Sequence, residues 1–284
     1  MQNRRRTPTK ATIKTIMPAE PIDPKTIDFR EVVDYAERAQ AAYWKPEEIQ
    51  QKYPLYVRVE DNQEVDVQYF VERDHDQQLH TITIRGTANK KNAKIDLKYL
   101  QSRDDMLGID LHRGFKKAAN LIYPEIKTLL GGAKNYKVRL TGHSLGAALS
   151  TILMMYLQVD GFTVEKSINF GQPKVTDGEG VIKYDSLPLI RVVNETDPVP
   201  LAPPSTLLSG LYQHMGPELV LLRGEFYSFL TRFLAERESV NNLSENIGDM
   251  DVPDHYMDNY ITSLRGKLNK ANLILFADRK KYLD

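Results

Sequence analysis

The chain has 284 residues, with 38 Lys and Arg against 38 Asp and Glu, and it contains no cysteine. This length is enough to bury a sizeable core in one large domain or two small ones. The formal net charge of zero gives no reason to expect binding to nucleic acid or to an anionic membrane. The absence of cysteine excludes disulfides, thiolate zinc sites and cysteine nucleophiles.

The N-terminal residues 1–27 contain four prolines and few apolar side chains, and we expect an extended or mobile arm. The basic start is not followed by an apolar core, so there is no recognisable signal peptide. The longest nearly apolar run, residues 147–157, is too short to cross a bilayer. We therefore expect a soluble protein without a transmembrane segment, and the sequence does not decide between secretion and the cytoplasm.

The rest of the chain alternates strand and helix patterns. Residues 28–43 have apolar side chains at helical spacing, and residues 64–72 and 78–86 have the β-branched content of strands. The predicted elements that follow are a helix at 113–130, a strand at 136–142, a helix at 145–159, and strands at 163–171 and 187–194. This order predicts an α/β fold with a mainly parallel central sheet and helices on both faces, in a single domain over residues 28–284.

Ser144 lies in the turn between a predicted strand and a predicted helix, in the sequence Gly-His-Ser-Leu-Gly. A strand, sharp turn and helix around such a serine is the arrangement of a nucleophile elbow. Gly142 and Gly146 would let the strand and the helix approach closely. The turn also places the Leu145 N–H at a helix N-terminus, where it could donate to an oxyanion. A serine is inert without a base, so the alternative is a serine that only caps the helix.

This segment resembles the class 3 lipase family, which includes fungal lipases and feruloyl esterases. Four further segments carry the resemblance in the same order, "IRGTA", "LHRGF", "FGQPKV" and "RVVNETDPVPLAPP". The resemblance extends over residues 79–264. It implies an α/β-hydrolase fold and ester hydrolysis through an acyl-enzyme, with no metal or organic cofactor.

The acid and the base of such a hydrolase follow the serine in the chain. Asp197 comes directly after an apolar strand, in a turn held by Pro198 and Pro200, and it matches the position of the family's acid. The alternative is an Asp that only forms the turn before proline. Of the two histidines after Asp197, His255 resembles the family's catalytic histidine near the chain end. His214 resembles a recurrent structural histidine of the family.

The second oxyanion donor is expected in the loop after an early strand. The resemblance points to Thr87, in the Arg-Gly-Thr sequence, with a plain turn as the alternative. His143 precedes the nucleophile, and we expect it to pack or hydrogen-bond away from the serine hydroxyl. His75 and His80 lie near a charged turn, and we expect both to face solvent.

Two segments are candidate covers of the site. The lid candidate, residues 88–106, is mostly polar and charged, which weakens the expectation of interfacial activation. The cap or pocket-wall candidate covers residues 203–250. Within it, helical spacing predicts one apolar stripe that contains the candidate substrate-binding residues Phe226, Phe229 and Phe233.

These observations predict a carboxylic ester hydrolase with the triad Ser144, Asp197 and His255 and the oxyanion donors Thr87 and Leu145. We first expect a triacylglycerol lipase. Its substrate would be an acylglycerol, which could be bound at a lipid–water interface. Esterase, phospholipase A1 and feruloyl-type esterase activities share the same triad and stay open. A non-catalytic binding protein is disfavoured because the triad is complete.

Overall fold

The computed structural model describes residues 22–62, 64–87, 100–203, 212–243 and 253–282. Its strands are β1 (Tyr56–Asn62), β2 (Val67–Asp74), β3 (Leu79–Ile84), β4 (Gln101–Asp104), β5 (Ile109–His112), β6 (Lys137–His143), β7 (Thr163–Phe170), β8 (Leu189–Asn194), β9 (Glu218–Leu221), β10 (Phe226–Leu230) and β11 (Asn272–Leu273). Its α-helices are α1 (Phe29–Ala41), α2 (Pro46–Lys52), α3 (Arg113–Gly131), α4 (Leu145–Val159), α5 (Gly178–Lys183), α6 (Arg232–Leu243) and α7 (Met257–Arg265). Four 3-10 helices complete the elements, η1 (Pro24–Thr26), η2 (Val199–Leu201), η3 (Pro253–His255) and η4 (Phe276–Tyr282).

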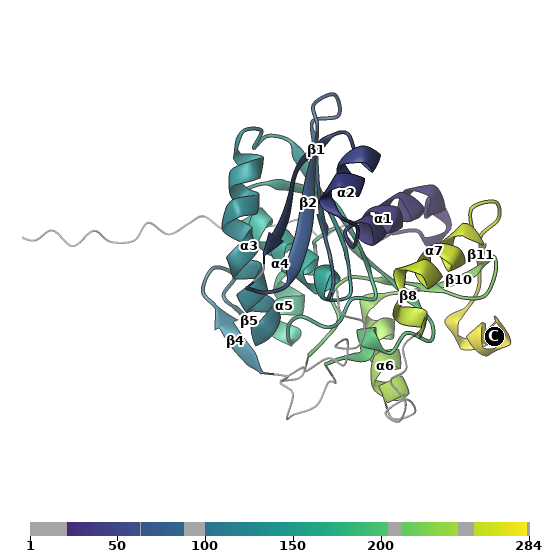
Figure 1. Cartoon of the computed structure of the whole chain (residues 1–284). Coiled ribbons are helices and arrows are strands. Elements are labelled where there is room, and N and C mark those ends of the chain that lie inside the picture. The colour runs from purple at the N-terminus through teal and green to yellow at the C-terminus, as the bar shows by residue number, and fades with distance from the viewer. Residues whose placement is uncertain (1–21, 63, 88–99, 204–211, 244–252, 283–284) are drawn as a thin grey trace, which may run out of the picture.

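A nine-stranded sheet forms the centre, in the order β1-β2-β3-β6-β7-β8-β9-β10-β11, and β4 pairs with β5 in a separate hairpin. The five neighbouring strands β3, β6, β7, β8 and β9 are parallel. Strand β2 runs antiparallel to both β1 and β3, and β10 runs antiparallel to β9. Helices α3 and α4 cover one face, and α1 and α7 cover the other (Figure 1). The predicted α/β architecture is confirmed. Parallel strands need crossover connections, and the helices on the two faces of the sheet provide them.

Helix α4 is apolar on nearly all sides because it lies between the sheet and α3. Its residues from Gly146 to Leu157 are all buried. The expected bounds of this helix, 145–159, are confirmed. In the described part of the chain, no helix combines the length and the hydrophobicity needed to span a bilayer.

Helix α1 brings the N-terminal part of the chain onto the C-terminal part. It begins after Asp28, whose carboxylate accepts the Arg30 N–H at 2.9 Å. Its apolar face packs against α7 in one buried cluster. At the edge of this contact, the Gln40 side chain donates to Asp258 at 2.5 Å. The two helices therefore form one layer on the same face of the sheet.

Ion pairs are buried at and beyond β8, and one of them includes Lys174 from the loop after β7. Arg191 on β8 pairs with Glu218 on β9 at 2.6 Å, and the guanidinium is fully buried. Lys174, with a side chain only 1% exposed, pairs with Glu236 on α6 at 3.1 Å. Burial lowers the pKa of Lys174 despite the opposing carboxylate of Glu236. Buried ion pairs as well as apolar contacts therefore connect the C-terminal strands to the rest of the fold.

The structure contradicts the predicted helical stripe of aromatic residues. Residues 226–230 form strand β10, which pairs with β9, and the helix starts only at residue 232. Phe226 packs on the Tyr282 ring, whereas Phe229 packs against the α1 and α7 cluster on the other face of the sheet. Phe233 lies on α6 with 74% of its surface exposed. The three side chains therefore cannot form one wall of an acyl pocket.

Parts of the other predicted segments lie outside the described residues, namely 1–21 of the arm, 88–99 of the lid candidate, and 204–211 and 244–250 of the cap candidate. The described end of the lid candidate is strand β4, in a hairpin with β5. Within the cap candidate, β9 and β10 extend the central sheet. These strands therefore belong to the body of the fold and do not form a cap.

Candidate active site

The turn between β6 and α4 holds Ser144 in a strained backbone conformation. Its φ is 57° and its ψ is −125°, outside the regions that an L-residue normally adopts. A Cβ atom at Gly142 would lie 2.4 Å from the Gly146 carbonyl oxygen, and one at Gly146 would lie 2.2 Å from that of Ile84. The expectation that both glycines allow a close approach of strand and helix is confirmed.

Two backbone segments meet beside Ser144. Leu145 is the first residue of α4, so its N–H has no partner within the helix. A Cβ atom at Gly86, which follows β3, would lie 3.0 Å from the Ser144 Cβ, and Thr87 is the next residue along the chain. Both segments predicted to supply oxyanion donors are therefore adjacent to the serine. Their role as donors stays a prediction.

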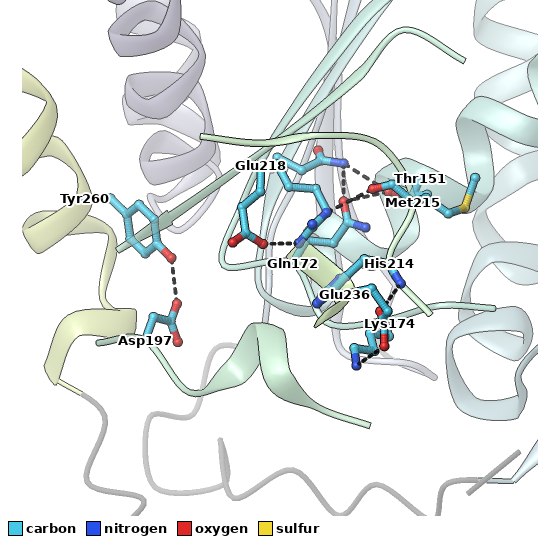
Figure 2. Close-up of polar contacts among 11 residues, drawn as sticks. Thr151, Gln172, Lys174, Asp197, His214, Met215, Glu218, Glu236 and Tyr260 are labelled. Atoms are coloured by element: carbon cyan, nitrogen blue, oxygen red, sulfur yellow. Dashed lines mark hydrogen bonds and ion pairs between the residues drawn. The ribbon is translucent and has the colours of Figure 1, made fainter. Parts of the chain in front are cut away.

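Asp197 and His255 are hydrogen-bonded to each other and buried. Asp197 lies in the turn after β8 and His255 ends η3, and the two residues are 3% and 4% exposed. The His255 Nδ1 lies 2.8 Å from the Asp197 Oδ2. Tyr260 on α7 donates its hydroxyl to the same Oδ2 at 2.6 Å (Figure 2), and Oδ1 accepts the Val199 N–H at 2.9 Å. Because an ionised carboxylate only accepts, Nδ1 carries the proton and Nε2 is left as the basic nitrogen.

Opposing effects set the pKa of Asp197. Burial raises this pKa, because the charged form loses its hydration. Electrostatic attraction to His255, together with hydrogen bonds from His255, Tyr260 and the Val199 N–H, lowers the pKa by more than burial raises it. The net pKa lies below the usual value of an aspartate, so the carboxylate is ionised at neutral pH.

The end of β7 brings the serine and the imidazole together. The Ser144 N–H donates to the Phe170 carbonyl at 2.9 Å. At the next residue, Gly171, φ is +55°, and a Cβ atom would lie 2.8 Å from the His255 Cε1 and 2.9 Å from the Asp197 Oδ2. Nε2 of His255 is buried and has no hydrogen-bond partner among the described residues. In this conformation His255 Nε2 therefore makes no hydrogen bond to the Ser144 hydroxyl.

The other histidines have structural surroundings, with one difference from the prediction. His112 caps α3 by accepting the Phe115 N–H at 3.3 Å, and burial lowers the pKa of His112 to about 4. His214 is buried beside the Lys174 and Glu236 pair (Figure 2). His75 is exposed as expected, but His80 is fully buried. His80 lies on β3, where strand alternation turns its side chain inward.

A small polar cavity lies next to Asp197. It has a volume of about 40 Å³, and its lining includes Glu195, His214, Glu218 and Ser239. This volume suits a few water molecules and is far too small for an acyl chain. Among the residues that the structure describes, no group of three or more His, Asp or Glu side chains could hold a metal ion.

Sequence reasoning missed two residues of this site. Tyr260 was not predicted as a site residue, although its hydroxyl donates to the carboxylate of Asp197. A buried tyrosine hydroxyl usually needs a polar partner, and that need was the available signal. Gly171 lies inside the quoted motif "FGQPKV", directly after a predicted strand. A glycine at that place indicates a close backbone approach.

Comparison with known proteins identifies a family for the central segment. Residues 81–207 match the family model described as lipase (class 3). A secreted mono- and diacylglycerol lipase from Fusarium solani is 30% identical over 156 residues, which cover 52% of this chain and 46% of that lipase. The chain spans about half the length of the curated relatives it matches.

Solved structures agree on the fold. Lipase II from Rhizopus niveus superposes with a TM-score of 0.59 and 25% identity, over 68% of this chain and 80% of that one. The Lip2 lipase from Yarrowia lipolytica reaches a TM-score of 0.65 at 18% identity, over 84% of this chain and 96% of that one. Residues 81–207 thus resemble the class 3 lipase family, and the chain has an α/β-hydrolase fold.

Proposed function

We propose that the protein is a serine carboxylic ester hydrolase, with Ser144 as nucleophile, His255 as base and Asp197 as orienting acid. The observation that carries the proposal is the buried hydrogen bond of 2.8 Å between Asp197 and His255, next to a serine in a strained turn at a helix N-terminus. A serine with a base and an orienting acid is the arrangement that activates a hydroxyl. A binding protein of this fold would have no need for the strained turn.

The mechanism follows from the roles of these atoms. Nε2 of His255 accepts the Ser144 proton as Oγ attacks the carbonyl carbon of the ester, and Asp197 stabilises the imidazolium that forms. The N–H groups of Leu145 and Thr87 donate to the oxyanion. The imidazolium then protonates the leaving alcohol, and water repeats the sequence on the acyl-enzyme to release the acid.

For the substrate we propose an acylglycerol, with a triacylglycerol lipase as the specific activity. The proposal is supported by the family and by relatives named mono- and diacylglycerol lipases. Short-chain esters, phospholipids cleaved at sn-1 and feruloyl esters are the alternative substrates, because the same triad serves all of them. We also propose that residues 28–284 form one domain, since α1 and α7 pack together on one face of the same sheet.

The test is a rate series over p-nitrophenyl esters of increasing chain length, emulsified triglyceride, a phospholipid and a feruloyl ester. Ser144→Ala should lower ester hydrolysis on the order of 10⁴-fold or more. Ser150→Ala is the matched control, because Ser150 is buried in the same helix and faces Ser167. A Ser144→Ala protein with wild-type rates would disprove the mechanism. A preference for phospholipid or feruloyl ester over triglyceride would disprove the lipase assignment alone.

A further inference from the structure

Tyr43 lies just after α1, and its hydroxyl sits between the segments that meet at the serine. Its oxygen is 2.8 Å from Nδ1 of His143, the residue before the nucleophile. Nε2 of the same imidazole is 2.6 Å from the carbonyl oxygen of His255. The phenol thus reaches the nucleophile turn directly and the backbone of the proposed base through one further ring.

The directions of these hydrogen bonds follow from the charge state of His143. Burial, together with electrostatic repulsion from His255, lowers the pKa of His143 to about 3, so the imidazole is neutral at neutral pH. A carbonyl oxygen only accepts, and Nε2 must therefore carry the single ring proton. Nδ1 is then an acceptor, and the Tyr43 hydroxyl is its donor.

The oxygen of Tyr43 has a further partner on the third segment. The Gly86 N–H bonds this oxygen, and it opposes the rise that burial produces in the pKa of the phenol. The fit is tight, because a Cβ atom at Gly86 would lie 2.4 Å from the Tyr43 oxygen and 2.6 Å from the His143 carbonyl oxygen. One unbroken chain of donors therefore runs from Gly86 through Tyr43 and His143 to the carbonyl of His255.

Gly86 directly precedes Thr87, whose N–H is the proposed second oxyanion donor. We infer that Tyr43 is a positioning residue, which fixes the loop of Gly86 and Thr87 against the Ser144 turn and so sets the oxyanion hole. This inference rests on the proposed function. Tyr43 itself touches no reacting atom in this scheme, because its hydroxyl is used by Gly86 and His143. Its effect should appear where negative charge develops on the substrate.

The test is Tyr43→Phe, which removes one oxygen and leaves the ring in place. With p-nitrophenyl butyrate, kcat should fall about 10- to 100-fold, since a misplaced oxyanion donor costs transition-state stabilisation. KM should stay within about twofold of the wild-type value. The Ki of butaneboronic acid, which forms a tetrahedral adduct with the serine, should rise in proportion to the fall in kcat.

Tyr35→Phe is the matched control. Tyr35 lies on α1 and is 2% exposed, and its hydroxyl has no partner among the described residues. Its removal should leave kcat and Ki unchanged. A p-nitrophenyl phosphonate releases one burst of p-nitrophenol per active site, and all rates are divided by the number of sites counted in this way. Partial unfolding of a preparation then lowers the number of active sites but not kcat per site.

The outcomes separate this inference from the proposed function. A phosphonate burst in the wild type that is absent in Ser144→Ala supports the nucleophile. With that burst present, a wild-type kcat in Tyr43→Phe would overturn the positioning role alone. A fall in kcat with an unchanged boronate Ki would also overturn it, because the loss would then not lie in the oxyanion hole. Absence of the burst in the wild type would overturn the proposed function itself.

Discussion

The interior around α4 and the interior of the fold beyond β8 contain different kinds of buried side chains. Around α4 most of the fully buried side chains are apolar, such as Ile82, Leu140 and Ile152. Beyond β8 the interior holds ion pairs, with Arg191 fully buried against Glu218. Burial of a charge pair loses hydration that the attraction only partly returns, whereas burial of an apolar side chain is favourable in itself. A single substitution should therefore lower the free energy of unfolding for a different physical reason in each region.

The largest effect is expected from Arg191→Met. This change leaves Glu218 without its cation in a buried site, which costs about 3–5 kcal/mol of unfolding free energy. Urea denaturation followed by circular dichroism measures the loss. The double variant with Glu218→Leu should recover most of the stability, because both charges are then gone. A loss that persists undiminished in the double variant would mean that the packing, and not the charge, holds this region.

A smaller loss is expected from Gly146→Ala in the apolar region. The new methyl group would meet the Ile84 carbonyl oxygen at 2.2 Å, and the backbone shift that this forces costs about 3 kcal/mol. The midpoint of urea denaturation again measures the effect. Gly131→Ala at the end of α3 is the control, since nothing lies within 4 Å of its Cβ position. A harmless Gly146→Ala would show that helix and strand can separate without cost.

The smallest effect is a pH dependence in the charged region. Burial raises the pKa of Glu195 from 4.5 to about 7, despite the opposing charge of Arg279. The folded state therefore binds this proton more tightly than the unfolded state between about pH 4.5 and pH 7. Stability should fall as the pH rises through this window and stay reduced above it.

Glu195→Gln cannot ionise and should remove that part of the slope. Unfolding free energies of the two proteins at pH 4.5, 6 and 8 give the difference. Glu64→Gln is the control, because the Glu64 side chain is 61% exposed. Parallel stability curves for wild type and Glu195→Gln would contradict the raised pKa and, with it, the picture of a charged interior beyond β8.

The contrast also explains which elements the sequence could predict. Helix α4 and the strands next to it follow from apolar runs of the right length, and their bounds agree with the structure within one or two residues. Strand β9 has only four residues, and the residue pattern alone did not predict it. Strand β10 is separated from α6 by one residue, so the combined apolar pattern of both elements imitates a helix. Polar sequence likewise concealed the hairpin of β4 and β5.

For the site, sequence order and family resemblance placed each proposed catalytic residue, but not the contacts between them. Asp197 and His255 are 58 residues apart, and only the fold could show that they share a hydrogen bond. The link from Tyr43 to His143 spans 100 residues, and no local pattern marks it. The Cβ distances at Gly171 depend on η3, which lies far along the chain. Such juxtapositions arise from topology and not from periodicity.

The layer of α1 and α7 has a consequence for how the chain can be divided. The segment that matches the family ends at residue 207 and starts at residue 81. A fragment cut at these limits would keep Ser144 and Asp197 but lose both helices of that layer and, with them, His255 and Tyr43. The boundaries of a family match are therefore unsuitable as cloning boundaries for this chain. An expressed piece should begin before Asp28 and extend past η4.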